Sequence, residues 1–171
     1  ELHDQSTRDP LTGLYNRRYF MGALRSELSM AERRSTSFAV LSFDADNFKT
    51  FNDNHGHDAG DVVLRAIGAK MTETFNEREV CCRFGGEEFT VLLPDADLAR
   101  ARQLAEDLRL GIEETKLRYG KQMLPAVTVS IGIALFPDNA LASHDLLQAA
   151  DEALYAAKHA GRNCIRIAQS E

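Results

Sequence analysis

The feature that most constrains the fold is the run FAVLSF at residues 38–43, because it is apolar at almost every position. A strand with one face in water alternates apolar and polar residues, whereas a strand buried on both faces reads as a continuous apolar run. Ser42 is the one polar residue in this run. The run therefore predicts a central strand that helices cover on both sides, and Asp44 stands where that strand stops.

Other segments supply the helices and strands around this strand. Apolar residues recur at helical spacing over residues 14–34, 57–75, 97–117 and 143–161. Ser143 is placed to cap the last helix, and Gly161 is placed to end it. Strand-like runs cover residues 80–84, 87–93, 126–136 and 164–168. Strands that alternate with helices, together with one hairpin, predict an α/β (α+β) fold with a mainly antiparallel or mixed sheet flanked by helices.

Composition limits what such a fold can do. A chain of 171 residues with 44% hydrophobic content buries one sizeable core, so we expect one domain over residues 9–171, after the end of an upstream linker at residues 1–8. The net charge of −6 disfavours binding to nucleic acid and direct contact with an anionic membrane. The sequence shows no long apolar stretch, no leader and no disulfide framework, which indicates a cytoplasmic domain.

A pair of glycines, Gly85 and Gly86, separates two strand-like runs and is followed directly by Glu87 and Glu88. A two-residue glycine turn can supply the positive φ angles of a tight hairpin. Charged residues are common at turns, so the two glutamates have a purely structural explanation. The two aspartates at the end of the central strand, in the sequence FDADNFK, have the same explanation when taken alone.

A second explanation joins these two acidic pairs. Side chains at the ends of neighbouring strands project towards one edge of a sheet, so Asp44 and Asp46 could converge with the two glutamates. Crowded carboxylates raise one another's pKa values unless a cation lies between them. Ligation by oxygen alone favours Mg²⁺ or Mn²⁺ over zinc. Because such a metal shares its ligands with substrate phosphates, this arrangement indicates phosphoryl or nucleotidyl transfer.

Five motifs stand in a fixed order along about residues 9–166: DPLTGLYNRR, FDADNFKTFNDNHGHDAGD, RFGGEEF, VTVSIGIA and ADEALYAAKHAGRN. In this order and spacing the chain resembles the GGDEF family of diguanylate cyclases, in the Gly-Gly-Glu-Glu-Phe form. The resemblance implies a fold similar to the palm of nucleotide polymerases, with the signature on a β-hairpin turn. It also implies an enzyme that joins two GTP molecules into cyclic di-GMP and releases two pyrophosphates, with one metal-bound GTP on each half of a homodimer.

The resemblance also implies roles for the acidic residues. Asp44, the main-chain carbonyl of Ala45 and Glu87 resemble the ligands of Mg²⁺ or Mn²⁺. Glu88 resembles the family's second acidic residue at the turn, which either completes a second metal position or helps to deprotonate the attacking 3′-hydroxyl, and both roles stay open. The glycine pair lacks Cβ atoms, so its backbone can approach the α-phosphate and the ribose closely.

Guanine is read, by the same resemblance, by Asn52 and Asp61, with His57 beside them as a local hydrogen-bonding residue. A carboxylate accepts from the N1–H and 2-amino groups of guanine, and an amide can meet the remaining polar edge. Adenine offers neither donor at that edge. The structural alternative is that Asp61 is a favourable charge in the first turn of a helix and that Asn52 is a loop or cap residue.

Three cations are the candidates that hold the phosphates: Lys49, Lys158 and Arg162. Lys158 and Arg162 lie four residues apart at the end of the last predicted helix, where cations also favour the helix dipole. That alternative alone would explain them, and the resemblance assigns all three to the β- and γ-phosphates. Arg83, next to the glycine turn, is expected to support the hairpin.

One departure from the family pattern concerns product inhibition. Many members carry R-x-x-D five residues before the glycine pair, where it binds product, but this chain has Asn76 and Glu79 at those two positions. The resemblance therefore implies that the primary inhibitory site is missing. Two alternatives remain, a catalytically silent GGDEF module that binds GTP or a protein partner, and a cyclase that closes a ring on one nucleotide. The controlling signal would come from an upstream sensory or receiver region.

Overall fold

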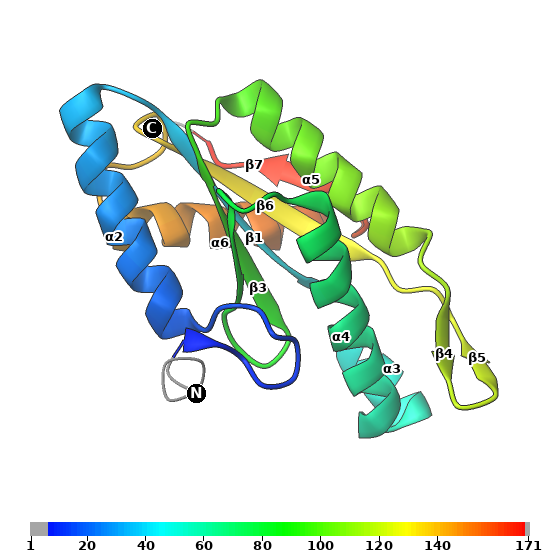
Figure 1. Cartoon of the computed structure of the whole chain (residues 1–171). Helices are drawn as coiled ribbons and strands as arrows, with labels where there is room; N and C mark the ends of the chain where they lie inside the picture. Colours follow the sequence, from blue (N-terminus) through cyan, green and yellow to red (C-terminus); the bar gives the residue numbers. More distant parts are fainter. Residues whose placement is uncertain (1–6, 170–171) are drawn as a thin grey trace.

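The computed structural model describes residues 7–169, so most of the linker predicted at residues 1–8 lies outside it (Figure 1). The strands of its main sheet are β1 (Phe38–Ala45), β2 (Val80–Arg83), β3 (Glu88–Pro94), β6 (Val129–Phe136) and β7 (Ile165–Ile167). Their order across this five-stranded sheet is β2-β3-β1-β6-β7. Neighbours are antiparallel except for β6 and β7, which are parallel. The predicted mixed sheet is confirmed.

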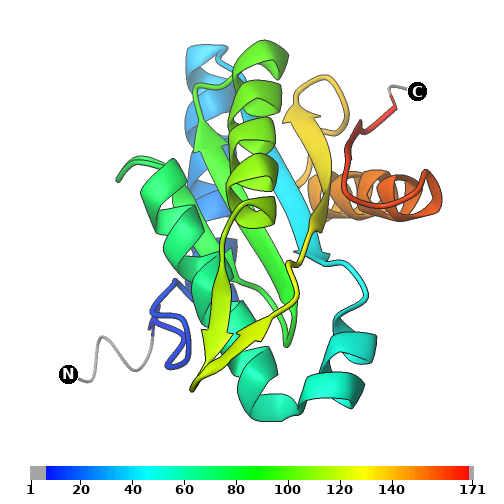
Figure 2. The same cartoon turned by 90° about the vertical axis from the view of Figure 1, so that its right-hand side faces the viewer.

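Helices cover both faces of this sheet, as the apolar central strand predicts. On one face lie α4 (His57–Thr74) and α5 (Leu98–Glu113), and on the other lie α2 (Arg17–Arg34) and α6 (Ser143–His159) (Figures 1 and 2). Between residues 7 and 169, the structure contains no helix with the length and apolar content of a membrane span.

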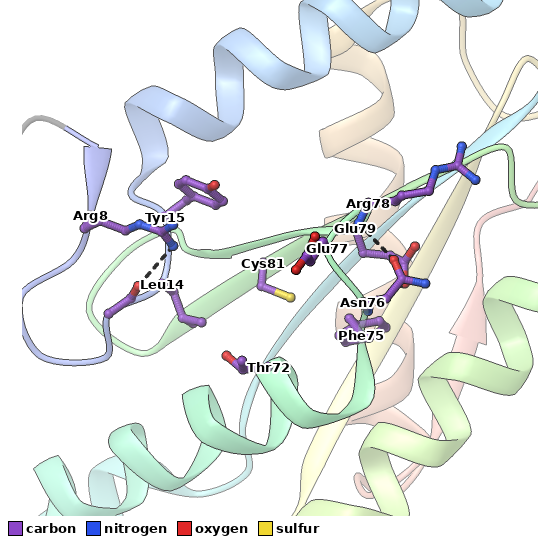
Figure 3. A pocket seen from close by; sticks show the side chains of 11 residues that line it. Arg8, Leu14, Tyr15, Thr72, Phe75, Asn76, Glu77, Arg78, Glu79 and Cys81 are labelled. Atoms are coloured by element: carbon purple, nitrogen blue, oxygen red, sulfur yellow. Dashed lines mark hydrogen bonds between the residues drawn. The ribbon is translucent and has the colours of Figure 1, made fainter. Parts of the chain in front are cut away.

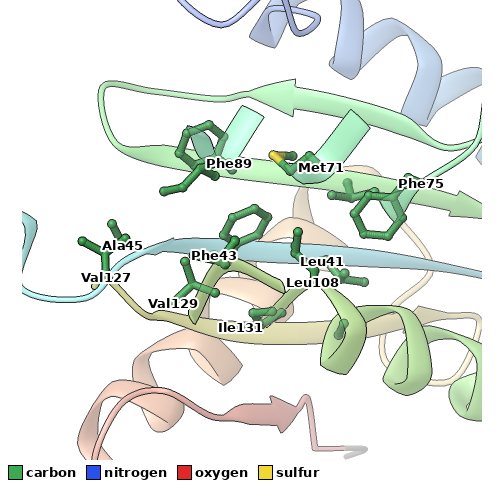
Figure 4. Close-up of a cluster of buried hydrophobic side chains, with 14 of the residues drawn as sticks. Leu41, Phe43, Ala45, Met71, Phe75, Phe89, Leu108, Val127, Val129 and Ile131 are labelled. Atoms are coloured by element: carbon green, nitrogen blue, oxygen red, sulfur yellow. The ribbon is translucent and has the colours of Figure 1, made fainter. Parts of the chain in front are cut away.

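The side chains of β1 alternate between two hydrophobic cores. Leu41 and Phe43 point into the core under α4 and α5, where Phe43 stacks on Phe89 with ring centroids 5.4 Å apart (Figure 4). Phe38 and Val40 point into the core under α2 and α6. Truncation of one such buried side chain typically costs about 2–5 kcal/mol. Packing on both faces therefore fixes β1 firmly, and with it the aspartates at its end.

Three short elements were not predicted from the sequence: α3 (Phe48–His55), β4 (Leu117–Tyr119) and β5 (Gln122–Leu124). A helix of 8 residues has too few turns to show a clear apolar period. The prediction that the helix from residue 97 reaches residue 117 is wrong, because α5 ends at Glu113 and Leu117 enters β4. Leu117 is apolar and buried in β4, as it would also be at the end of a longer helix. Its spacing in the sequence therefore does not distinguish a helix from a strand.

The hairpin between β2 and β3 differs from the predicted glycine turn. Residues 84–87 connect the two strands, and the N–H groups of Phe84 and Gly85 both donate to the Glu88 carbonyl, at 2.7 and 3.2 Å. Neither Gly85 nor Gly86 has a positive φ angle. The prediction of a two-residue turn is therefore wrong, since the longer loop reverses the chain without left-handed residues.

Helix α6 packs very closely on the sheet. A Cβ atom on Gly132 of β6 would overlap the carbonyl oxygen of Ala150 and the backbone nitrogen of Leu154, so only glycine allows this approach. The helix begins at Ser143, but its N-cap residue is Ala142 and no side chain caps it, so the predicted capping role of Ser143 is wrong. Close packing brings the last turn of α6 to the end of β1.

Candidate active site

Three carboxylates lie at one edge of the sheet, where β1 ends and β3 begins. The strand register pairs Asp44 with Glu88, and Glu87 precedes Glu88 in the hairpin loop. Burial raises the pKa of Glu87, and the negative charge of Asp44 raises it further, whereas Lys158 lowers it. The structure thus places Asp44 opposite Glu88 in the strand register and near enough to Glu87 for the two charges to interact.

Lys158 provides the positive charge at this edge. Its ammonium nitrogen lies 2.5 Å from Oδ1 of Asp44, and the two side chains are 28% and 15% exposed. Burial raises the pKa of Asp44, while the hydrogen bond and charge of Lys158 lower it. Beside this pair, the Ser42 hydroxyl donates to Asp151 of α6 at 2.6 Å. The carboxylate of Asp44 is therefore held against a cation of the protein itself.

Asp46 does not join the other carboxylates. It is only 6% exposed, and its oxygens accept from the hydroxyls of Thr128 and Ser130 at 2.7 and 2.6 Å and from the backbone N–H of Asn163 at 3.0 Å. The predicted convergence of all four carboxylates is wrong, because these hydrogen bonds hold Asp46 inside the protein. Within residues 7–169, no three His, Cys, Asp or Glu side chains lie close enough together to hold a metal ion.

A cavity of about 630 Å³ opens beside the hairpin. This volume lies within the range of about 300–1,000 Å³ that is typical of small-molecule and cofactor sites. The cavity gathers seven of the residues predicted from the sequence, which are Lys49, Asn52, His57, Asp61, Gly86, Glu87 and Glu88. The helices α3 and α4 form one wall, and the hairpin forms the other. Asp44, Ala45, Gly85, Lys158 and Arg162 do not line this cavity.

The side chain of Asn52 occupies space in the cavity wall that is free only because residue 60 is glycine. A Cβ atom on Gly60 would overlap Oδ1 of Asn52 and come within 3.3 Å of the Phe48 ring. This Oδ1 atom is buried and has no hydrogen-bond partner within the protein. A buried acceptor without a partner costs free energy, so the site fits a ligand that carries a donor. The sequence showed Asn52 but not the role of Gly60.

Arg83 links the hairpin loop to Asp9, near the start of the chain. Arg83 donates to the Gly86 carbonyl from Nε at 3.0 Å and from a terminal nitrogen at 2.7 Å, and it also reaches Asp9 at 3.1 Å. Asp9 in turn accepts from the backbone and hydroxyl of Thr12. The predicted support of the hairpin by Arg83 is confirmed. Asp9 was missed, although an Asp three residues before a Thr is a recognisable turn signal.

The remaining predicted cations lie further out. Lys49 is 90% exposed and forms an ion pair with Asp53 at 3.5 Å. Such an exposed pair contributes little to stability, so Lys49 is available at the rim of the cavity. Arg162 is exposed and follows the end of α6, with a positive φ angle of 64°. The structure therefore brings Lys158 to the acidic edge and leaves Lys49 and Arg162 on its periphery.

A larger cavity of about 940 Å³ lies elsewhere, at the start of β2 (Figure 3). Residues 76–79 line it, but the charged groups of Arg78 and Glu79 already have partners within the protein. Glu79 accepts from the Asn76 backbone at 3.1 Å, and Arg78 forms an ion pair with Asp95 at 2.5 Å. None of the predicted catalytic or binding residues lines this space. Size alone therefore does not identify the active site, and the chemistry favours the smaller cavity.

The fold and this site define a class of α/β domain in which an acidic sheet edge lies beside a cavity of nucleotide size. The chain belongs to the family described as diguanylate cyclase, GGDEF domain, which it matches over residues 6–164.

Curated relatives agree with this assignment. The chain is 40% identical over 159 residues to the response regulator PleD of Caulobacter vibrioides, covering 92% of this chain and 35% of PleD. It is 39% identical over 161 residues to the probable diguanylate cyclase DgcT of Escherichia coli, covering 94% of this chain and 35% of DgcT. The chain thus spans about a third of the length of these relatives.

Solved structures share the fold. The GGDEF domain of DgcB from Caulobacter crescentus, solved in complex with c-di-GMP, superposes with a TM-score of 0.90 at 34% identity, covering 96% of this chain and 94% of that one. The active GGEEF domain of a diguanylate cyclase from Vibrio cholerae superposes with a TM-score of 0.83 at 30% identity, covering 91% and 98%. The predicted membership of the GGDEF family is confirmed.

Proposed function

We propose that this domain is a diguanylate cyclase, which condenses two GTP molecules into cyclic di-GMP and releases two pyrophosphates. The observation that carries the proposal is the cavity that joins Asn52 and Asp61 at one end to Glu87 and Glu88 at the other. The same Glu-Glu form of the signature occurs in the Vibrio cholerae domain, which is described as active.

The base end of the cavity is suited to guanine. The Asp61 carboxylate would accept from the N1–H and 2-amino groups, and the unpartnered Asn52 oxygen needs a donor of this kind. His57 lies at the same end as a further hydrogen-bonding residue. With adenine, each unmatched partner would cost about 1–3 kcal/mol, so two mismatches approach a thousandfold preference for GTP.

The acidic edge is suited to a hard divalent cation. Asp44, the Ala45 carbonyl and Glu87 would hold Mg²⁺ or Mn²⁺, because these ions prefer oxygen ligands. The ammonium of Lys158 on Asp44 is consistent with this assignment, since the crowded carboxylates already require a positive charge. The metal would neutralise the triphosphate and polarise the α-phosphate. Substrate oxygens would complete its ligand sphere, because the protein offers few carboxylates here.

The remaining residues would orient the reacting groups. Glu88 is exposed at the start of β3, where it either completes a second metal position or accepts the proton of the ribose 3′-hydroxyl. As the 3′-oxygen bonds to the α-phosphorus of the second GTP, the bond to the bridging oxygen breaks and pyrophosphate leaves. Lys49, Lys158 and Arg162 would hold the β- and γ-phosphates. The glycine pair leaves open space beside the ribose, since a Cβ on Gly86 meets no atom within 4 Å.

Catalysis would require a homodimer. The proposed site holds one GTP, so a second copy must present its own nucleotide with the 3′-hydroxyl in line with the neighbour's α-phosphorus. Specific activity should therefore rise with enzyme concentration over the range in which sedimentation shows dimers forming. Constant activity per molecule down to the purely monomeric range would contradict this part of the proposal.

The decisive experiment is to incubate the protein with GTP and Mg²⁺ and to determine the mass of the product, with ATP as the matched control. Cyclic di-GMP is the expected product. A protein that binds GTP but forms no product would be a silent GGDEF module, and a monomeric cyclic nucleotide would indicate a mononucleotide cyclase.

Because the relatives are about three times longer, we place the regulatory signal in an upstream sensory or receiver region and the domain itself in the cytoplasm, where GTP is available.

A further inference from the structure

The turn between α6 and β7 has an unusual backbone. Three consecutive residues have positive φ angles, Gly161 at 112°, Arg162 at 64° and Asn163 at 47°. Glycine adopts this region freely and asparagine tolerates it, but for arginine it is strained. Such strain persists only where surrounding contacts impose it, and it often marks a functional position. The contacts that impose this conformation can be identified.

Asn163 anchors the turn on two sides. Its backbone N–H donates to the buried Asp46 at 3.0 Å, next to the end of β1. Its side-chain amide donates to Glu113 of α5 at 2.7 Å, and its side-chain oxygen accepts from Arg109 of α5, also at 2.7 Å. The side-chain oxygen and the side-chain amide of Asn163 therefore both have partners on α5, while its backbone N–H is bound next to the end of β1.

These partners are themselves held in place. Arg109 is only 14% exposed and makes a two-pronged contact with Glu106, at 2.8 and 2.7 Å. This fork geometry leaves the third nitrogen of Arg109 directed at Asn163. On the other side, Thr128 and Ser130 fix the carboxylate of Asp46. Asn163 thus makes hydrogen bonds to two groups of side chains that are themselves hydrogen-bonded, one on α5 and one around Asp46.

We propose that Asn163 is a positioning residue, which holds Arg162 in its left-handed conformation so that the guanidinium is directed at the phosphates of bound GTP. Arg162 follows Lys158 by four residues, and Lys158 already contacts the acidic edge. Through Asn163, the side chains of Arg109 and Glu113 on α5 would therefore influence how Arg162 meets the phosphates. This inference rests on the proposed function, because it assigns Arg162 to the triphosphate.

The primary test is Asn163→Gly, which keeps the backbone donor and accepts a positive φ but removes both side-chain anchors. Binding is measured with 3′-deoxy-GTP and Mg²⁺, since this analogue lacks the attacking hydroxyl and cannot react. We expect the affinity for 3′-deoxy-GTP to fall about tenfold, as for loss of one oriented charge contact.

Two controls accompany this measurement. Affinity for GMP, which lacks the β- and γ-phosphates, should change less than about twofold. Ser35→Gly is the matched control, because Ser35 is exposed, has φ 55° and lies at the end of α2.

A double-mutant cycle separates positioning from general support of the fold. In the Arg162→Ala background, Asn163→Gly should lose most of its effect on 3′-deoxy-GTP, because the group it positions is gone. Arg109→Met, which removes one anchor and leaves the turn sequence unchanged, should weaken 3′-deoxy-GTP in the same direction. It provides the test if the first variant fails to fold.

Three outcomes would overturn the inference. Equal losses for GMP and 3′-deoxy-GTP would show a general structural effect. Additive losses in the double mutant would show that Asn163 does not act through Arg162. Unchanged 3′-deoxy-GTP affinity in both anchor variants would contradict the inference alone, whereas a wild-type protein that binds no 3′-deoxy-GTP would contradict the proposed function as well.

Discussion

The two ends of the proposed GTP site are built by different physical means. At the base end, sterics decide the geometry, because Asn52 occupies the space that a side chain on Gly60 would take. At the phosphate end, charges decide it, because Lys158 contacts Asp44 while Lys49 and Arg162 remain exposed. In the proposed site, packing would therefore preform the base end, whereas the ion pairs at the phosphate end could exchange their partners for ligand.

Loss of one carboxylate at the phosphate end should have the largest effect on catalysis. Asp44→Asn or Glu87→Gln should reduce turnover of GTP by more than about a hundredfold, since even a group behind a metal ligand can contribute that much. The fold should remain, because both residues lie at the sheet edge. Activity and circular dichroism together check this. Glu152→Gln, on the exposed face of α6, is the control for loss of one charge. Unfolding of either variant, or most activity retained, would refute the metal assignment.

A single added methyl group should weaken the binding of GTP at the base end of the site. Gly60→Ala should displace Asn52 and raise the KM for GTP about tenfold, the size of one lost hydrogen-bond partner. Alanine favours a helix over glycine by about 1 kcal/mol, so the helix itself should not suffer. Gly22→Ala in α2 is the matched control, because its new Cβ would meet no atom within 4 Å. Equal kinetics for the two variants would show that Gly60 does not shape the base pocket.

We expect the product to cause little inhibition through the surface at residues 76–79. Asn76 has no charge, and Arg78 and Glu79 already have partners in the protein, so progress curves should lack the early plateau of tight product inhibition. Asn76→Arg combined with Glu79→Asp should introduce or strengthen inhibition by cyclic di-GMP. Low-micromolar inhibition of the unmodified domain would show that another surface binds product.

The smallest effect should appear in the stability of the ligand-free protein. Burial and Asp44 raise the pKa of Glu87 above its ordinary value of 4.5, so the folded state disfavours the charged form. This contribution to stability is present below the unfolded pKa and is lost as pH rises through the folded pKa. Glu87→Gln should therefore be slightly more stable than wild type at pH 7, with a difference that shrinks towards pH 4. Urea unfolding at both pH values measures it, and a difference that grows on acidification would contradict the assigned sign.

Much of the fold could be predicted because its signals are local. The apolar run before Asp44 indicates a strand buried on both faces, and the long helices show a clear apolar period. The hairpin was located correctly, but its loop was too short in the prediction because Gly85 and Gly86 do not use positive φ angles. Helix α3 was missed because 8 residues give too few turns for a period to emerge.

The sequence predicted some residues of the candidate site and gave no sign of others. The resemblance supplied residue identities, and the structure gathers Asn52, Asp61 and the hairpin glutamates in one cavity. Asp46 was assigned to the acidic cluster because an Asp-x-Asp pattern does not show which carboxylate finds partners inside the protein. Gly60 was overlooked because a glycine in a helix carries no sign of the side chain it accommodates.

Local patterns and motifs in the sequence were enough to predict the layered α/β architecture, the position of the acidic hairpin and the family to which the chain belongs. The packed fold was needed to show that Asp44 contacts Lys158, that Asp46 is a buried anchor and that Gly60 makes room for Asn52. The physical reason is range: secondary structure follows from neighbouring residues, whereas Asp46 and Asn163 are 117 positions apart and meet only when β1, β6 and the α6–β7 turn have packed together.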